Sequence, residues 1–445
     1  MHRLQTQLHS MGVALGLLIL VAMSACSGPA TEQTGQTGQT GQAAEEPATV
    51  TVYEGARLID GNGQIIESAA FAVENENGKF VSVGAVGEVD VPAGASRVDL
   101  SGMTVIPAIV DAHTHLSTTR EALIEDLERR AFHGVGAAMS LGTDGEGAPL
   151  EMRDEVITGA GWYRSAGRGI TSPEPGRSEV PHWVTTEDEA RQAVRDEVAR
   201  NVDIIKIWVD ERNGQYEKLS PELYGAVIDE AHQNGVRVIA HIFALEDAKG
   251  LLRAGVDGFA HGVRDQDIDD ELVELVLERP NVVLVPNMPH RGVPTELGWL
   301  SGSMPPEELA ELAKMQAAAI GRPEAQASFA IQARNLARLS EEGMRIAFGT
   351  DGNTPWAPHV EMEDMVAAGM TPAQVLVAAT RNAAELSGLS EIGTVEVGKS
   401  ADFVVLEANP LDDITNTRRI FAVYLRGVEV DRDALSARWT GESAE

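Results

Sequence analysis

The hydrophobic and polar positions of this chain follow two different patterns. From residue 49 to about residue 104, short runs of alternating apolar and polar residues are separated by turn signals such as Asn75-Glu76-Asn77. A period of two predicts antiparallel strands with one buried face. The same pattern returns near the carboxyl end, in runs at residues 393–399, 402–406 and 420–425. Because the first set of strands lacks partners, we predict one small β-sandwich built from both chain ends.

The middle of the chain changes to apolar runs separated by amphipathic stretches, which is typical of a parallel sheet with crossover helices. Eight strands are expected in this rhythm, which favours an α/β fold of the (β/α)8 TIM-barrel type. A doubly wound open sheet is the alternative, but chemically active residues follow five of the strands, and a barrel brings all strand ends to one mouth. The expected strands are residues 106–111, 137–141, 161–166, 203–209, 237–241, 258–261, 281–286 and 345–349, and the expected helices are residues 120–132, 187–201, 221–234, 246–254 and 372–386.

These patterns predict the following organisation along the chain. Residues 49–107 and 392–435 form the two parts of the sandwich, and residues 108–391 form the barrel. Residues 436–445 are a tail. The segment 27–48 is polar and repeats Thr-Gly-Gln, so it cannot bury enough apolar surface to fold and is expected to be a tether.

The first 26 residues have the features of a targeting signal. An apolar run from residue 11 to residue 23, too short to span a bilayer comfortably, leads into Met23-Ser24-Ala25-Cys26. This stretch resembles a bacterial lipoprotein signal, and an ordinary signal peptide is the alternative. The resemblance implies lipidation of Cys26 and a periplasmic, lipid-anchored protein, with Ser27 favouring the outer membrane of a Gram-negative bacterium.

Composition narrows the classes of function. With 445 residues and 43% hydrophobic content, the chain can build a large core. Its 68 acidic and 35 basic residues give a net charge of -33, which argues against nucleic-acid binding, because phosphate contacts need a positive surface. A saline habitat and a merely acidic surface both explain this charge. Cys26 is the single cysteine, so disulfides within the chain are excluded. We expect a small-molecule substrate and membrane contact only through the anchor, and formation of a homo-oligomer stays open.

Candidate chemistry begins at Asp111-Ala112-His113-Thr114-His115, directly after an apolar run. Alternate side chains of a strand share a face, so His113 and His115 project together, about 7 Å apart, close enough to hold one ion. Lys206 lies inside an apolar strand, where an ammonium is costly unless it is paired or chemically changed. A neutral amine there can react with carbon dioxide to give a carbamate, whereas an ion pair with Asp210 is the structural alternative.

Three further residues end predicted strands. His241 and His261 each follow a short apolar run, and Asp351 closes the eighth strand. A carboxylate there can bind a metal ion and also accept a proton from the attacking water. We therefore assign His113, His115, Lys206, His241, His261 and Asp351 as metal ligands, with Asp351 also catalytic.

This order of residues, from residue 49 to residue 435, resembles the amidohydrolase superfamily. The segments 254–262, 368–372, 393–399 and 401–405 add to the likeness, which is strongest to the imidazolonepropionase-like and Xaa-Pro dipeptidase-like branch. The resemblance implies two divalent metal ions, usually zinc. It places His113, His115 and Asp351 on one ion and His241 and His261 on the other, with a carbamate on Lys206 bridging them.

The expected reaction is hydrolysis of an amide bond of a small molecule, with a dipeptide or an N-acyl amino acid as first choice. A lactonase or other esterase using the same site is the alternative, and a non-catalytic metal-binding or solute-binding lipoprotein is a second one. Residues 167–177 depart from the Gly-Gly-His element of the dipeptidases, so those substrate contacts cannot be transferred. Basic side chains in strand-end loops could bind a substrate carboxylate, and Trp356 and His359 could line the pocket. The basic candidates are Arg164, Arg168, Arg177, Arg264 and His290.

Overall fold

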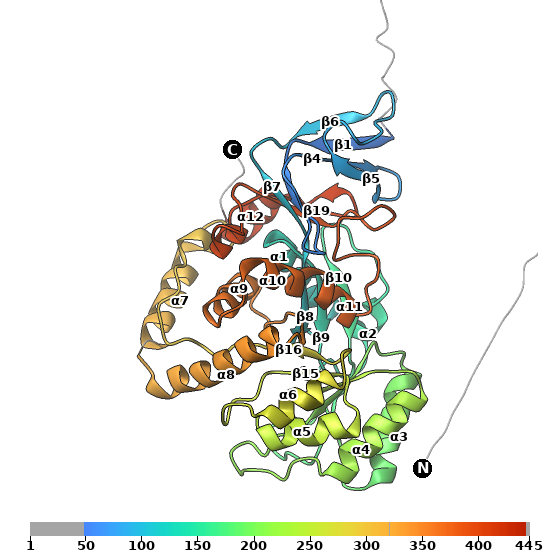
Figure 1. The fold of residues 1–445 in the computed structure, drawn as a ribbon, viewed down its shortest axis with the longest axis vertical. Coiled ribbons are helices and arrows are strands. Elements are labelled where there is room, and N and C mark those ends of the chain that lie inside the picture. The colour runs from blue at the N-terminus through green and yellow to red at the C-terminus, as the bar shows by residue number, and fades with distance from the viewer. Residues whose placement is uncertain (1–48, 320, 442–445) are drawn as a thin grey trace, which may run out of the picture. The chain divides into compact units, whose positions relative to one another are not determined.

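The computed structural model describes residues 49–319 and 321–441 (Figure 1). The predicted signal sequence, tether and lipidation site at Cys26 lie outside these residues. Within the described part of the chain, no helix has both the length and the apolar character needed to cross a membrane.

Parallel strands form a closed barrel in the centre of the described chain. The sheet order is β10-β9-β8 in one part and β12-β11-β13-β14-β15-β16-β17 in the other. Two backbone hydrogen bonds join these parts, from Asp203 N to Ser165 O and from Ala112 N to Phe348 O, each 3.0 Å long. The ring of strands is therefore closed, which excludes the open sheet and gives a TIM-barrel-type α/β fold. The strands are β8 (Ile109–Thr114), β9 (Val135–Ser140), β10 (Trp162–Ser165), β11 (Ile170–Thr171), β12 (His182–Trp183), β13 (Ile205–Trp208), β14 (Val238–His241), β15 (Gly258–Ala260), β16 (Val283–Val285) and β17 (Arg345–Ile346).

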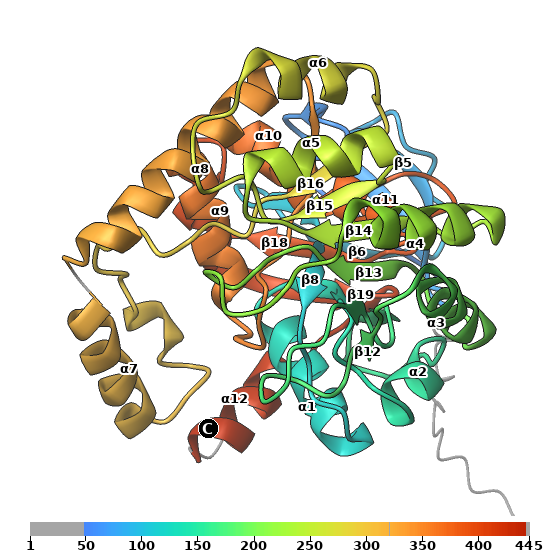
Figure 2. The ribbon, with the colours of Figure 1, turned by 90° about the horizontal axis from the view of Figure 1, so that it is seen from below.

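Helices surround these strands, and Figure 2 shows several of them outside the sheet. Most of them bury an apolar face against the strands, as the alternation in the sequence predicts. The helix starting after Thr186 has a capping box in which Thr186 and Glu189 satisfy each other's backbone amides. The helices are α1 (Arg120–Phe132), α2 (Ala148–Met152), α3 (Glu187–Ala199), α4 (Pro221–Gln233), α5 (Leu245–Ala254), α6 (Asp270–Leu277), α7 (Pro306–Ala319), α8 (Pro323–Glu341), α9 (Ala357–Ala367), α10 (Pro372–Val377), α11 (Ala383–Leu386) and α12 (Arg432–Thr440).

The first predicted barrel strand is two strands. Residues 106–111 were expected to be continuous, but the backbone changes partners at Ala108. Its amide donates to Asp402 O at 3.0 Å, whereas the amide of Ile109 donates to Gly134 O at 2.9 Å. As a result β7 (Thr104–Pro107) belongs to a flanking sheet and β8 to the barrel. An unbroken apolar run cannot reveal such an exchange of hydrogen-bond partners.

Two other element predictions are corrected. The helix expected at residues 372–386 is interrupted by a π-helical turn at Ala378–Asn382. Residues 393–399, expected to be a strand, contain none, although Val395 N donates to Asp60 O at 2.9 Å. Single long-range hydrogen bonds therefore hold this segment instead of a ladder.

Two sheets lie beside the barrel and combine strands from both parts of the chain. One has the order β5-β4-β1-β6 and the other β20-β19-β18-β7-β2-β3. Ring centroids of Tyr53 and Phe403 are 5.2 Å apart, so aromatic side chains from both sheets share one core. This core supports the predicted β-sandwich. We propose the sandwich and the domain boundaries given above. The strands are β1 (Val50–Glu54), β2 (Arg57–Ile59), β3 (Ile65–Ile66), β4 (Ala69–Glu74), β5 (Lys79–Ala85), β6 (Ser96–Asp99), β18 (Phe403–Leu406), β19 (Ile420–Leu425) and β20 (Val428–Glu429).

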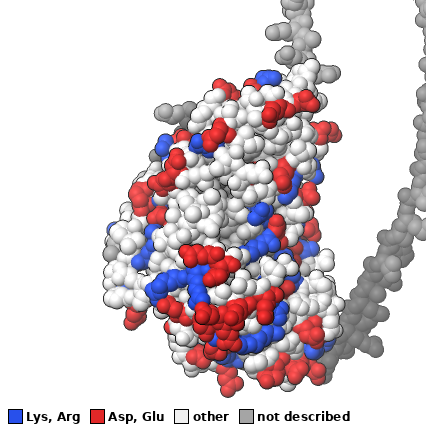
Figure 3. Space-filling view, viewed as in Figure 1, with Lys and Arg blue, Asp and Glu red and all other residues white. Residues whose placement is uncertain are grey.

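The face seen in Figure 3 carries acidic and basic side chains close together in its lower part. Lys249 of α5 contacts Glu271 of α6 at 2.8 Å, and Arg334 of α8 contacts Asp267 at 2.7 Å. Local pairing of this kind reduces repulsion within a chain of net charge -33.

A buried ion pair ties the first barrel strand to the eighth. Arg130 Nη1 lies 2.8 Å from Asp111 Oδ2, and the two side chains are 1% and 0% exposed. Asp111 also accepts hydrogen bonds from Thr350 N at 3.0 Å and Thr350 Oγ1 at 2.7 Å. Arg130 Nη2 donates to Gly352 O at 2.9 Å. This pair therefore fixes the end of β8 against the segment that carries Asp351.

Replacing Arg130 with Met should leave a buried, uncompensated carboxylate at Asp111. We expect the free energy of unfolding to fall by about 3–5 kcal/mol, measured by urea denaturation. Arg334→Met is the control, because it removes an exposed ion pair and should change stability little. Equal losses in the two variants would contradict the role assigned to the buried pair.

Candidate active site

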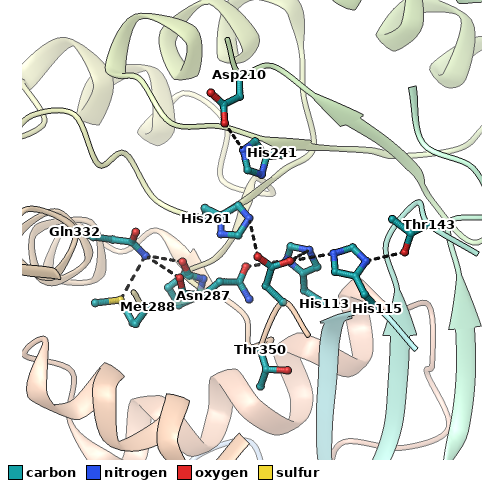
Figure 4. A network of polar contacts seen from close by, with 12 residues as sticks. His113, His115, Thr143, Asp210, His241, His261, Asn287, Met288, Gln332 and Thr350 are labelled. Atoms are coloured by element: carbon teal, nitrogen blue, oxygen red, sulfur yellow. Dashed lines mark hydrogen bonds and ion pairs between the residues drawn. The ribbon is translucent and has the colours of Figure 1, made fainter. Parts of the chain in front are cut away.

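Three histidines that Figure 4 labels, His113, His115 and His261, converge on Asp351 at the carboxyl ends of the barrel strands. Asp351 Oδ1 lies 3.1 Å from His113 Nε2 and 3.0 Å from His115 Nε2. Asp351 Oδ2 lies 3.5 Å from His261 Nε2. One ligand atom from each of His113, His261 and Asp351 falls within a mutual distance of 4.8 Å, so these three residues could hold one ion.

The fourth histidine stands next to this group but contacts other partners. The rings of His241 and His261 have centroids 4.6 Å apart. His241 Nε2 lies 2.9 Å from Asp210 Oδ2 and 3.0 Å from Arg212 Nη1. The structure thus brings all four predicted histidines together, each ring next to another, with His241 facing Asp210 (Figure 4).

Lys206 is buried in β13 without a hydrogen-bond partner for its Nζ among the described residues. Asp210, its alternative partner, is instead occupied by His241 and by Arg212 Nη1 at 2.8 Å. Burial lowers the pKa of Lys206 to about 7. An amine that loses its proton so readily has a free lone pair, which is what metal binding or reaction with carbon dioxide needs.

The histidines are held in the form that binds metals. Burial lowers the pKa of His113 to about 4 and that of His241 to about 3, so both rings are neutral near pH 7. His113 Nδ1 lies 2.8 Å from Asn287 Oδ1, an oxygen that can only accept. His113 therefore donates there and presents an unprotonated Nε2 to the carboxylate of Asp351. Two acceptors facing each other require a cation between them, so these residues fit a metal ion.

Unfavourable backbone conformations at three residues accompany this convergence of side chains. His261, Asn287 and Asp351 have positive φ angles of 75°, 45° and 55°. Such conformations are unfavourable for residues with a Cβ and persist where surrounding contacts enforce them, often at functional sites. Gly349 allows the close approach of the strands, because a Cβ there would lie 2.7 Å from His113 N.

A cavity of about 300 Å³ opens beside these ligands. One wall is the ring of Trp208, which packs so closely on Gly169 that a Cβ at that position would overlap it. The cavity is lined by His115, Thr143, Thr171, Glu174, Arg177, Ser178, Pro181, Trp208, Arg212, His241 and Asp351. It therefore joins the candidate metal ligands to a set of polar and charged groups suited to a small polar molecule.

Of the five basic residues suggested by the sequence, only Arg177 lines this cavity. Arg264 is half-buried, with its guanidinium carbon 5.4 Å from the centre of the Phe243 ring. Three others have different surroundings: Arg164 donates to Arg153 O at 2.7 Å, Arg168 donates to Val180 O at 2.6 Å, and His290 is exposed beside Gln316. The structure therefore does not place Arg164, Arg168 or His290 at the cavity.

Other cavity residues were not expected from the sequence. Trp208 had a usable signal, since it lies two positions after Lys206 and shares its face of the strand. Glu174 and Arg212 lie in long loops, where no period indicates the direction of a side chain. His359, considered for the pocket, is buried and contacts Thr417 Oγ1 and His133 O, each at 3.0 Å, so its contacts are structural.

A barrel that brings histidines and a carboxylate to one cavity at its strand ends is typical of metal-dependent hydrolases. Residues 104–430 match the family model described as Amidohydrolase family. The chain belongs to the amidohydrolase family and is a hydrolase acting on carbon–nitrogen bonds.

Curated relatives and solved structures agree with this family. Ochratoxinase from Aspergillus niger is 26% identical over 426 residues, covering 84% of this chain and 84% of the relative. Imidazolonepropionase from Geobacillus thermodenitrificans is 26% identical over 402 residues, covering 78% of this chain and 85% of the relative. A structure described as "putative prolidase from Bifidobacterium longum" has a TM-score of 0.70 and 28% identity, covering 88% of this chain and 99% of that one.

Asn287 should control metal affinity through His113. We expect Asn287→Ala to weaken zinc binding about 10–100-fold, because His113 then loses the acceptor that fixes its tautomer and ring orientation. Competition with a chromophoric chelator measures this affinity. Asn234→Ala, at the end of α4, is the control and should bind zinc like the parent protein. Unchanged affinity in Asn287→Ala would show that His113 is oriented by other contacts.

Proposed function

We propose that this protein is a metal-dependent amidohydrolase that cleaves the amide bond of a small molecule, a dipeptide or an N-acyl amino acid. The observation that carries this proposal is the convergence of His113, His115 and His261 on Asp351 beside a cavity. The names of two relatives, ochratoxinase and imidazolonepropionase, are consistent with hydrolysis of small molecules.

We further propose two divalent ions, zinc by preference, because neutral imidazoles suit this metal. His113, His115 and Asp351 would hold one ion, and His241 and His261 the other. When bound, such a pair supplies polarisation of the amide carbonyl and acidification of the attacking water. Lys206 would add carbon dioxide at Nζ, releasing a proton and leaving an anionic carbamate between the two positive centres. This charge would relieve their mutual repulsion.

Asp351 has the central role in proton transfer. Its carboxylate accepts a proton from the attacking water as the water oxygen bonds to the carbonyl carbon. It then returns that proton to the leaving nitrogen as the carbon–nitrogen bond breaks, so that one water is consumed and an acid and an amine are formed. The distances of 3.0 to 3.5 Å from the Asp351 oxygens to three histidine ring nitrogens support this role.

The same arrangement could attack a lactone or another ester, which remains the alternative substrate class. A non-catalytic metal-binding or solute-binding lipoprotein is not retained, because the chain belongs to a family of hydrolases and has Asp351 in place. The lipid anchor at Cys26 and the location in the periplasm stay predictions from the sequence, and formation of a homo-oligomer stays open.

Zinc-loaded protein should hydrolyse some members of a panel of dipeptides and N-acyl amino acids, with release of amine as the measurement. Asp351→Asn should abolish this turnover while much of the zinc stays bound, because the amide cannot accept the proton. Zinc content by mass spectrometry distinguishes loss of chemistry from loss of metal. Turnover of lactones or phosphotriesters alone would refute the substrate class, and an active Asp351→Asn variant would refute the proton-transfer role.

Lys206→Ala should lose activity, and short-chain carboxylic acids should partly restore it by supplying the missing bridge. In the parent protein, zinc together with ¹³C-bicarbonate should give a carbamate carbon signal in the NMR spectrum, and Lys206→Ala should lack that signal. A parent protein that binds two zinc ions without a carbamate signal would contradict the bridge. One bound zinc and no signal would indicate a mononuclear site.

A further inference from the structure

Arg177 and Arg212, which we call the arginine pair, form a connected group with Glu174 on the wall of the cavity. Glu174 Oε1 accepts from Arg212 Nε at 3.1 Å, and Glu174 Oε2 accepts from Arg177 Nη1 at 2.9 Å. All three residues line the cavity that contains Asp351 and His241. A single carboxylate thus aims two guanidinium groups at the same space.

The three side chains differ in access. Glu174 is 5% exposed and uses both oxygens on the arginines, whereas Arg177 is 46% and Arg212 13% exposed. Arg212 Nη2 and the Nε and Nη2 of Arg177 have no hydrogen-bond partner within the described residues. Glu174 therefore serves to position the arginines, and the unpaired N–H groups are left to bind a ligand.

The position of Arg212 relative to the reacting centre is fixed. Its Nη1 lies 3.0 Å from His241 Nε2, so the guanidinium touches a candidate metal ligand. Arg212 has a φ of 53°, held by its own amide, which donates to Asp210 Oδ1 at 2.9 Å. A left-handed backbone conformation enforced in this way restricts where the side chain can reach. A group bound here would share one cavity with an amide held beside Asp351.

We propose that Arg177 and Arg212 bind a free carboxylate that the substrate carries next to its scissile amide. This inference rests on the proposed amide hydrolysis and assigns its substrate class: N-acyl amino acids or dipeptides with an ionised carboxyl group. Guanidinium groups match a carboxylate through paired N–H donors. Glu174 and Asp210 offset the charges of the two arginines, so recognition of the carboxylate depends on the free guanidinium N–H donors.

The negative net charge of the chain makes the arginine pair more important for binding an anionic substrate. At a net charge of -33 the protein repels an anionic substrate at long range, so binding depends on short-range donors inside the cavity. A lactone offers these donors no carboxylate. The arginine pair therefore favours the amide class over the ester alternative.

Two matched substrates test this assignment. One is an N-acyl amino acid, and the other is the N-acyl amine that lacks the carboxylate but keeps the same amide and side chain. Zinc-loaded parent protein should prefer the first by about 100-fold or more in kcat/KM, because the largely buried donors of Arg212 are left unpaired by the second. Arg212→Met and Arg177→Met should each reduce this preference, Arg212→Met by about 100-fold. Arg212→Lys should recover part of it, because a charge without the planar fork binds less well.

Arg195→Met provides a matched control, because Arg195 is 45% exposed on α3 and lies outside the cavity lining. It should leave the preference unchanged. Calorimetric titration of each zinc-loaded variant with the amino acid product gives a second measurement, and only Arg212→Met and Arg177→Met should raise Kd. Zinc content is measured throughout. If Arg212→Met instead loses zinc, the contact with His241 serves metal retention and the proposal is overturned.

Failure of the proposed amide hydrolysis and failure of the arginine-pair proposal give different experimental results. If the parent protein hydrolyses neither amide, the proposed function fails, and the calorimetric measurement alone decides whether the arginine pair binds carboxylates. If it hydrolyses both amides equally and the variants behave like Arg195→Met, amide hydrolysis stands and the arginine pair is refuted.

Discussion

The ion pair between Asp111 and Arg130 joins the two chain segments that carry the first and the last of the active-site ligands. Asp111 lies on β8 two residues before His113, and its carboxylate also holds the backbone and hydroxyl of Thr350. Thr350 directly precedes Asp351. A charge removed from water in this way is tolerated only because every part of it is matched by donors. The requirement to satisfy Asp111 therefore sets the distance between the histidines of the first strand and the carboxylate of the eighth.

The ligand residues occupy conformations that this framework has to maintain. His261, Asn287 and Asp351 all have a left-handed backbone conformation. Each lies shortly after a short barrel strand. Asn287 is restrained further, since Gln332 Nε2 donates to Pro286 O and Met288 N donates to Glu361 Oε1 at 3.0 Å. A stiff barrel with strained strand ends keeps the histidines near one another before any ligand arrives. Pre-organisation of this kind reduces the cost of collecting several ligands around one centre.

Most of the architecture could be predicted because periodic patterns report it directly. Alternating apolar runs and amphipathic helices indicated the barrel, and strand-end residues indicated His113, His241, His261 and Asp351. The features that the sequence did not predict depend on information that no local pattern contains. The exchange of partners at Ala108 is set by chain segments far away in sequence, and so is the direction of Arg212 and Glu174 in their loops. Arg164, Arg168 and His290 were plausible only because of residue type, and tertiary contacts turn them elsewhere.

The pairing of β7 with β18 has a consequence for how the chain folds. Phe403 lies opposite Pro107 in this ladder, so strands far apart in sequence complete one sheet. Closing so long a loop is slow, so the β18 side of β7 pairs late, whereas β2 is close in sequence. The barrel strand that continues from β7 must then form next to an open sheet edge, which is a surface prone to wrong pairing. The risk of wrong pairing at this edge is therefore a property of this topology, independent of how stable the finished protein is.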